Sequence, residues 1–344
     1  MFFDTCEFRG LAFIAKLCQY ACHLSRVLFV PSVICPECHL SRVSFSPECH
    51  LSPRPSAVCK PLGGQRCQLK SSTKMTYSLI EKFGTEACSS FLAMLFGLSI
   101  VANDHLLKTK GHKIGFGFIA FGFGMAFAIP LVIFGFVSAH LNPAMCIALL
   151  LLGKVDAKEA FVSIGGEIIG MFLGAVMVYL LFLPHFNLRP DTDLESNDDS
   201  LVKEDQHRKL AVFATGPAVK AHWAHSFFVE FVCTTILIAC ALGVYSRHAQ
   251  IADHADFVMY RSLEGITIGW LVFVMVLGMG GVTAIAANPA RDFCPRLAHF
   301  VLPIANKGPS NWAYAIIPVV APFLGGVVGA YLFKFVSMLT HFSV

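Results

Sequence analysis

Charged residues are scarce in this sequence. Asp, Glu, Lys and Arg together make up 14% of the 344 residues, whereas hydrophobic residues make up 56%, and the mean hydropathy is +0.65. Soluble globular domains carry about one quarter charged residues. The composition therefore argues against an ordinary soluble protein and indicates a chain that is largely embedded in lipid.

The chain also lacks an excess of either charge beyond its first part. Residues 1–74 contain nine Lys or Arg and four Asp or Glu, which leaves 17 basic and 18 acidic residues from Met75 onward. Without surplus basic charge there is no electrostatic footprint for nucleic acid. Phosphate-binding loops, nucleophile elbows and carboxylate pairs in a polar setting are absent too. We therefore expect no nucleic-acid partner, no enzymatic activity, no cofactor and no metal.

Residues 1–74 differ from the rest of the chain. They hold eight of the 13 cysteines, and the unit Cys-His-Leu-Ser begins at positions 22, 38 and 49. One interpretation is a zinc site formed by Cys35, Cys38, Cys49 and His50, but their spacing matches no standard zinc finger. The other is a poorly ordered Cys/His-containing extension ahead of a working start at Met75. We favour the second interpretation and predict one membrane domain at 75–344.

Stretches without charge predict the spans of this domain. A helix needs about 20 residues to cross the hydrocarbon core, and backbone groups in lipid must be satisfied internally. The predicted fold class is therefore an all-α membrane protein with six transmembrane helices. The expected spans are about 86–106, 114–136, 160–183, 222–245, 262–282 and 312–336.

One charge-free stretch is too long for a single crossing. Residues 114–153 contain no Asp, Glu, Lys or Arg, and a helix of that length would measure about 60 Å. The run is interrupted at Asn142-Pro143-Ala144, and Pro143 suits the first turn of a new helix. The ten or so apolar residues that follow are too few to cross. We predict a re-entrant half-helix here and a second one at Asn288-Pro289-Ala290.

The two halves of the domain repeat each other. Asn142 and Asn288 are 146 positions apart, and Glu86 and Glu230, each an acid at the head of an apolar span, are 144 apart. Each half, at about 80–185 and 222–338, thus contains three spans and one half-helix. Because three spans per half is an odd number, the second copy must insert upside down, which gives an inverted internal repeat.

The doubled Asn-Pro-Ala motif resembles the major intrinsic proteins, the aquaporins and aquaglyceroporins. The second copy continues as Arg291-Asp292 with Arg296 four positions later, which is similar to the glycerol-conducting branch. Pro318-Val319 resembles that branch as well. Phe213-Ala214-Thr215-Gly216-Pro217 resembles its third-loop motif, with Gly216 as a departure.

This resemblance covers about residues 80–338. It implies a homotetramer of passive channels that conduct glycerol, water and urea and exclude ions and protons. A water-selective channel is one alternative, and a secondary transporter with broken helices is another. A third is a membrane-anchored binding protein that works through its Cys/His segment.

Both motif asparagines are candidate pore residues. Half-helix N-termini carry unpaired N–H groups and partial positive charge, so the amides of Asn142 and Asn288 can donate to a passing water or hydroxyl. Each Asn can also cap its own helix. Arg291 should face a wet cavity, because a charge in lipid is costly.

The resemblance implies a narrow ring around Arg291. Phe121, Val276 and Ile285 are its other expected members, and core packing is the alternative for these three. Val276 stands where water-selective members usually carry His. The expected ring is therefore wider and more apolar than theirs.

An acidic residue inside a transmembrane span is expected to have a functional role, because burying its charge in lipid is costly. Glu86 and Glu230 could relay protons, but the resemblance favours their accepting hydrogen bonds from the re-entrant loops. His140 is expected to brace the first loop, with pH sensing as the alternative. Asp292 is expected to stabilise its half-helix from the first turn. Glu167 receives no role from the sequence.

Six spans bring both termini to the same side of the membrane. Basic residues before Glu86 argue for a cytoplasmic N-terminus, and Lys108, Lys110 and Lys113 argue weakly against it. We expect the plasma membrane. The acid-rich run 191–205 in the loop 184–221 is interpreted as solvated surface.

Overall fold

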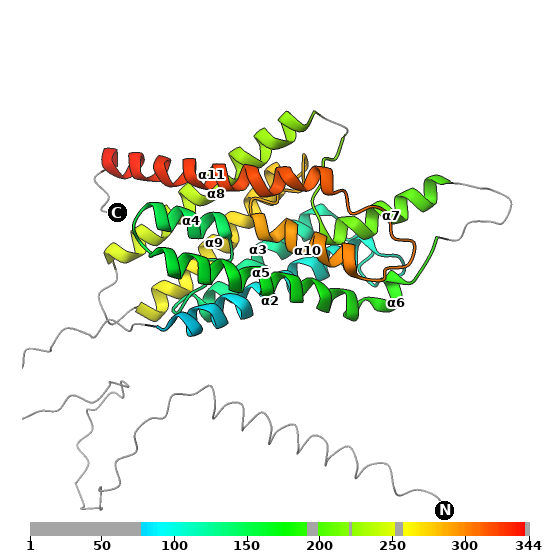
Figure 1. Cartoon of the computed structure of the whole chain (residues 1–344), viewed down its shortest axis with the longest axis horizontal. Coiled ribbons are helices and arrows are strands. Elements are labelled where there is room, and N and C mark those ends of the chain that lie inside the picture. Colours follow the sequence, from blue (N-terminus) through cyan, green and yellow to red (C-terminus); the bar gives the residue numbers. More distant parts are fainter. Residues whose placement is uncertain (1–76, 191–198, 220–221, 252–256, 341–344) are drawn as a thin grey trace, which may run out of the picture. The chain divides into compact units, whose positions relative to one another are not determined.

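The computed structural model describes residues 77–190, 199–219, 222–251 and 257–340 (Figure 1). The predictions for residues 1–74 therefore lie outside the described part of the chain. Within that part the secondary structure is helical. The helices are α2 (Leu79–His105), α3 (Phe116–Phe134), α4 (Pro143–Leu151), α5 (Ala157–Leu181), α6 (Leu183–Phe186), α7 (Asp199–Phe213), α8 (Trp223–Ile251), α9 (Phe257–Met279), α10 (Pro289–Val301) and α11 (Trp312–Thr340).

Six of the described helices are long and apolar enough to cross a membrane, namely α2, α3, α5, α8, α9 and α11. This confirms the six predicted spans, although some of their ends differ. Helix α2 begins seven residues before the predicted start at 86, because Ser78 and Glu81 form a capping box. The Ser78 amide donates to Glu81 Oε2 at 2.7 Å, and the Glu81 amide donates to Ser78 Oγ at 3.2 Å. Paired caps of this kind fix a helix start even where charged residues follow.

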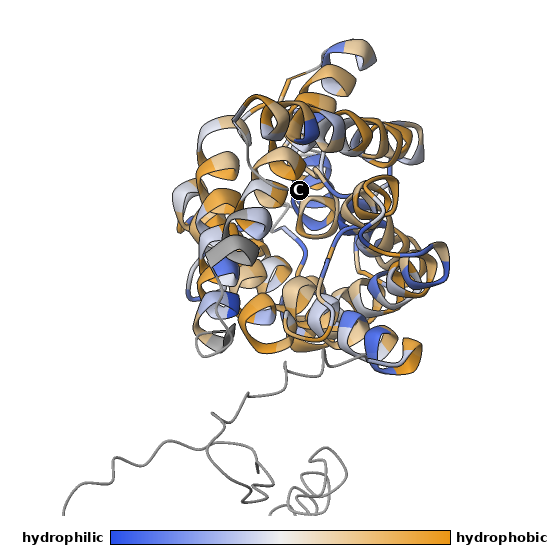
Figure 2. Cartoon of the chain, turned by 90° about the vertical axis from the view of Figure 1, so that its left-hand side faces the viewer, coloured by the Kyte–Doolittle hydropathy of each residue, from blue (hydrophilic) through white to orange (hydrophobic). Residues whose placement is uncertain are grey.

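Helices α4 and α10 are the two half-helices. They contain nine and 13 residues, which is too short for a crossing. Each begins with the motif proline at its first position, directly after an extended Asn. In the end-on view, hydrophilic loop segments lie inside a ring of largely hydrophobic helices (Figure 2).

Glycines allow equivalent helix pairs in the two halves to pack closely. A Cβ at Gly170 of α5 would lie 2.2 Å from the backbone oxygen of Ala87 in α2, and one at Gly325 of α11 would lie 2.5 Å from that of Phe231 in α8. Close backbone approach through small residues is the usual way in which helices associate in lipid. The matching contacts support the internal repeat.

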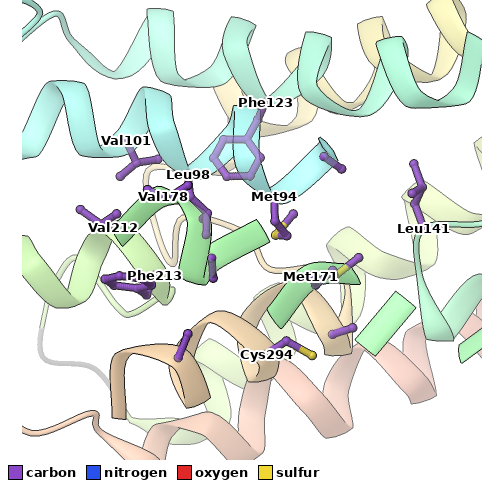
Figure 3. Packing of buried hydrophobic residues seen from close by; sticks show 14 of the residues in the cluster. Met94, Leu98, Val101, Phe123, Leu141, Met171, Val178, Val212, Phe213 and Cys294 are labelled. Carbon is purple, nitrogen blue, oxygen red and sulfur yellow. The ribbon is translucent and has the colours of Figure 1, made fainter. Parts of the chain in front are cut away.

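The buried core draws residues from α2, α3, α5, α7 and α10 and also from α8, α9 and α11. Met94, Leu98, Phe123, Val178 and Phe213 are among its members (Figure 3). Large hydrophobic side chains are also exposed on the outer faces of the spanning helices. That distribution suits a protein whose perimeter contacts lipid.

The loop 184–221 contains a helix that we did not predict. Residues 191–198 lie outside the described part, but helix α7 begins at Asp199. Asp205, which we predicted to lie on a solvated surface, is buried and paired with the buried Lys209 at 2.8 Å. The interpretation as solvated surface is therefore wrong for Asp205, because tertiary contacts cover one face of α7, whereas Lys203 and Glu204 on the same helix are exposed.

Candidate pore

The two re-entrant loops meet through their motif asparagines. Asn142 Nδ2 donates to the Ala287 carbonyl at 2.9 Å, and Asn288 Nδ2 donates to the Leu141 carbonyl at 2.6 Å. The oxygens of the same amides cap their own helices, since Asn142 Oδ1 accepts from Ala144 N and Asn288 Oδ1 accepts from Ala290 N. Each Asn thus caps one half-helix and ties it to the opposite loop.

The backbone before each motif adopts an unusual conformation. Leu141 in the first loop and Ala284, Ile285 and Ala287 in the second have positive φ angles of 57°, 66°, 42° and 46°. Such angles cost a non-glycine residue about 1–3 kcal/mol each unless the surroundings enforce them. The loops therefore need strong external support.

Glu86 and Glu230 lie in positions to provide that support. Glu86 accepts hydrogen bonds from Ser138 Oγ at 2.6 Å, from the His140 amide at 2.8 Å and from the Leu141 amide at 3.3 Å. Glu230 accepts from Thr283 Oγ1 at 2.7 Å and from the amides of Ala286 and Ala287 at 3.0 Å each. Both acids are fully buried. Each carboxylate thus gathers the donors of one loop.

His140 and Glu167 extend the support of the first loop. His140 Nδ1 lies 2.7 Å from Glu86 Oε1. Glu167 of α5 accepts a hydrogen bond from the backbone N–H of Asn142 at 2.7 Å and one from Cys146 Sγ at 3.4 Å. This contact could not be predicted from the sequence, because Glu167 is 25 positions away from Asn142 and one helix further along the chain.

Asp292 makes longer-range contacts than the predicted first-turn role requires. Its carboxylate accepts from the amide and hydroxyl of Thr215 at 2.7 and 2.6 Å. It also pairs with Arg296, whose Nε lies 2.7 Å from Oδ1. Asp292 therefore attaches α10 to the loop that follows α7.

A cavity of about 70 Å³ runs past the two motifs. Its wall is polar around the asparagines and Arg291 and otherwise mostly apolar. The lining residues are Phe123, Phe127, Leu131, His140, Leu141, Asn142, Met145, Leu237, Ile238, Ala241, Tyr245, Ile268, Val272, Met275, Val276, Ile285, Ala286, Ala287, Asn288 and Arg291.

Arg291 lies in this wall together with two of the predicted ring members, Val276 and Ile285. Its guanidinium carbon lies 4.7 Å from the ring centroid of Phe123, within the range of a cation–π contact. Arg291 is 7% exposed, and its Nη1 has no hydrogen-bond partner among the described residues. This buried nitrogen thus carries two N–H donors that no described protein group accepts.

The prediction for Phe121 is wrong. Phe121 is 43% exposed and contacts the rings of Trp270 and Phe273 in α9, at centroid distances of 6.4 and 5.7 Å. Side chains two positions apart on a helix point in nearly opposite directions, so Phe123 faces the cavity instead. The spacing of Phe123, Phe127 and Leu131 is the signal that could have identified the lining face.

The fold and the cavity define a membrane channel built from an inverted repeat. The sequence model of the major intrinsic protein family matches residues 73–333. A probable glycerol uptake facilitator protein of Thermotoga maritima is 37% identical over 261 residues, which is 76% of this chain and 99% of that protein. The glycerol uptake facilitator protein of Bacillus subtilis is 36% identical over 253 residues, 73% of this chain and 83% of that protein.

A solved structure agrees with these matches. The aquaglyceroporin from Plasmodium falciparum aligns with a TM-score of 0.62 and 25% identity, and the alignment covers 77% of this chain and all of that one. This chain belongs to the major intrinsic protein family. The resemblance inferred from the motifs is thereby confirmed, and the family consists of passive channels and facilitators rather than enzymes.

Proposed function

We propose that this protein is a passive channel for glycerol, water and other small uncharged solutes such as urea. The observation that carries the proposal is the part of the cavity wall where the Arg291 guanidinium lies together with the apolar Val276, Ile285 and Phe123. We propose that this part is the constriction of the pore. Relatives whose names state glycerol uptake, and the solved aquaglyceroporin, support the same solute class.

A polyol has a hydrocarbon edge and a hydroxyl edge, and the cavity wall is divided in the same way. Arg291 and the amides of Asn142 and Asn288 can donate to hydroxyl oxygens. Apolar side chains from α3, α8 and α9 can cover the carbon edge. A solute can therefore exchange its hydration for fixed partners on one side while it slides along hydrocarbon on the other.

Exclusion of charge follows from the same geometry. The N-termini of α4 and α10 meet near the centre, and each carries about half a positive charge. Together with Arg291 they form the electrostatic barrier known for aquaporin-type pores. Cations and protons meet this barrier, whereas a neutral solute does not.

A swelling assay on proteoliposomes tests the proposal. Glycerol, water and urea should all permeate faster than in protein-free vesicles. The glycerol flux should rise linearly with concentration and should ignore proton and sodium gradients. A water flux without glycerol flux would instead indicate the water-selective alternative. A saturable flux that follows an ion gradient would indicate a secondary transporter.

We further propose that four copies assemble, with one pore in each subunit. The family resemblance is the main support, and the hydrophobic outer faces of the spanning helices supply surfaces that can pack together in lipid. Native mass measurement in mild detergent should give four copies. A stable monomer under those conditions would contradict this assembly.

We also propose that the channel lies in the plasma membrane with both termini in the cytoplasm. An even number of spans brings the termini to one side, and basic residues such as Lys70, Lys74 and Lys82 favour the cytoplasm for the N-terminus. A C-terminal epitope should be labelled only after intact cells are permeabilised. Labelling without permeabilisation would reverse the orientation.

A further inference from the structure

Helix α7 contains a lysine in an unusual environment. Lys209 is 1% exposed, and lysine is almost never this deeply buried unless its charge is paired. Its Nζ donates to the carbonyls of Leu188 and Ala305 at 2.8 Å each and lies 2.8 Å from Asp205 Oδ2. All three donors of the ammonium group are therefore used.

The acidic partner of Lys209 is itself held by a second segment. Asn306 Nδ2 donates to Asp205 Oδ2 at 2.7 Å, and Asn306 has a positive φ of 54°. Ala305 and Asn306 belong to the loop between α10 and α11. The Lys209–Asp205 pair thus fastens α7 to that loop.

Helix α7 leads directly into a segment that touches both sides of the constriction. The helix ends at Phe213, and Thr215 then donates to Asp292, the neighbour of Arg291. The next residues pair with the loop before Ile285. Gly216 N donates to the Thr283 carbonyl at 3.2 Å, and Ala218 N donates to the Val282 carbonyl at 2.9 Å.

Arg296 completes a buried hydrogen-bond network around this segment. Its Nη2 donates to the Thr215 carbonyl at 2.9 Å and its Nη1 to the Ser310 carbonyl at 2.8 Å. Ser310 lies in the same loop as Ala305. The contacts therefore run from Lys209 to the 302–311 loop, from there to Arg296, and back to the segment that continues α7.

We propose that Lys209 is a positioning residue for the constriction, and that it determines how sharply the channel discriminates solutes by size. This proposal rests on the proposed function. Removal of the ammonium group releases α7 from two carbonyls and leaves Asp205 buried without its cation. The segment 215–218 is then no longer anchored at the end where it leaves α7. As a result, the distance between Arg291 and Ile285 is no longer fixed.

A matched control is present on the same helix. Arg208 pairs with Glu204 at the same i, i+4 spacing, but this pair is partly exposed. Exposed pairs contribute little to stability. Arg208→Met removes one cation from α7 and leaves the buried hydrogen-bond network intact. It therefore separates the role of the buried Lys209–Asp205 pair from the general effect of charge on the helix.

The test compares Lys209→Met, Arg208→Met and the wild-type protein in proteoliposomes, with water, glycerol and the four-carbon polyol erythritol as solutes. In Lys209→Met the ratio of erythritol to glycerol permeability should rise at least about threefold, equivalent to a small change in relative barrier height. In Arg208→Met the ratio should stay at the wild-type value. A ratio of permeabilities does not depend on how much protein inserts correctly.

An unchanged ratio in Lys209→Met, or the same change in both variants, would overturn the proposal. If Lys209→Met does not fold, Lys209→Gln serves instead, because glutamine keeps a polar group in the buried site while it removes the ammonium group that pairs with Asp205. The same rise in ratio is expected there, and its absence would refute the role of Lys209. A wild-type protein without glycerol flux would refute the proposed function itself.

Discussion

Arg291 is the residue on which the account of ion exclusion depends. Its charge lies in the cavity wall, partly covered by Phe123, with one nitrogen free of protein partners in the described structure. Arg291→Val deletes this fixed cation and leaves both half-helix dipoles in place. We expect the proton conductance of proteoliposomes, followed with a pH-sensitive dye, to rise clearly above the wild-type value. Conductance at background would mean that the dipoles alone suffice.

Glu167 accepts a hydrogen bond from the backbone N–H of Asn142 at the start of the first half-helix. Glu167→Gln keeps an acceptor at this place, whereas Glu167→Leu leaves a buried N–H unpaired, at a cost of about 1–3 kcal/mol. The Leu variant should therefore melt at a lower temperature in detergent than the Gln variant. Equal melting temperatures would show that this bond does not support the loop.

The positions of single residues could be predicted from the sequence where the motif itself determines the local backbone. Asn142 and Asn288 begin their half-helices as expected, since proline at the following position fixes the helix start. The prediction of Phe121 as a ring member failed, because the motif resemblance did not determine how α3 is rotated about its axis. Only the contact with α9 determines which phenylalanine faces inward.

At the scale of elements, close packing of α2 and α5 depends on glycine. A methyl group at Gly170 would lie 2.2 Å from a backbone oxygen of α2, whereas one at Gly165 on the same helix meets its nearest neighbour, a Phe83 ring atom, at 3.6 Å. Gly170→Ala should therefore lower the melting temperature of the detergent-solubilised protein by several degrees. Gly165→Ala is the control and should leave it unchanged or raise it slightly. Similar behaviour of the two variants would argue against backbone contact in this helix pair.

The elements themselves were largely predictable from the absence of charge. The charge-free run 114–153 is too long for one crossing, which is why the break at the first motif could be located. Helix α7 was not predicted, because its burial depends on Ala305 and Asn306, about 100 positions further along the chain. The polar composition of this segment did not reveal that one face of α7, with Asp205 and Lys209, is buried.

At the scale of the whole molecule, residues 1–74 should not be required for permeation. The family match begins at residue 73, and one relative is covered over 99% of its own length by the part that aligns. Deletion of residues 1–74 should leave the glycerol permeability per inserted protein unchanged. A loss of permeability that zinc chelation reproduces on the full chain would favour the metal-site interpretation of this segment.

If the constriction is built for a polyol, a substitution at Val276 should separate the glycerol flux from the water flux. Val276 lines the cavity beside Arg291 and Ile285. Val276→His adds bulk and a polar ring, which narrows the opening and makes contact with the carbon edge of glycerol less favourable. Val276→Thr is the control, because it is nearly isosteric and should stay close to wild type.

Stopped-flow light scattering on matched proteoliposomes measures water and glycerol fluxes for these three proteins. Val276→His should lower the glycerol flux at least about tenfold, roughly 1.4 kcal/mol of barrier, while the water flux falls much less. Equal loss of both fluxes would indicate simple damage to the pore. A wild-type protein that conducts water but no glycerol would contradict the account.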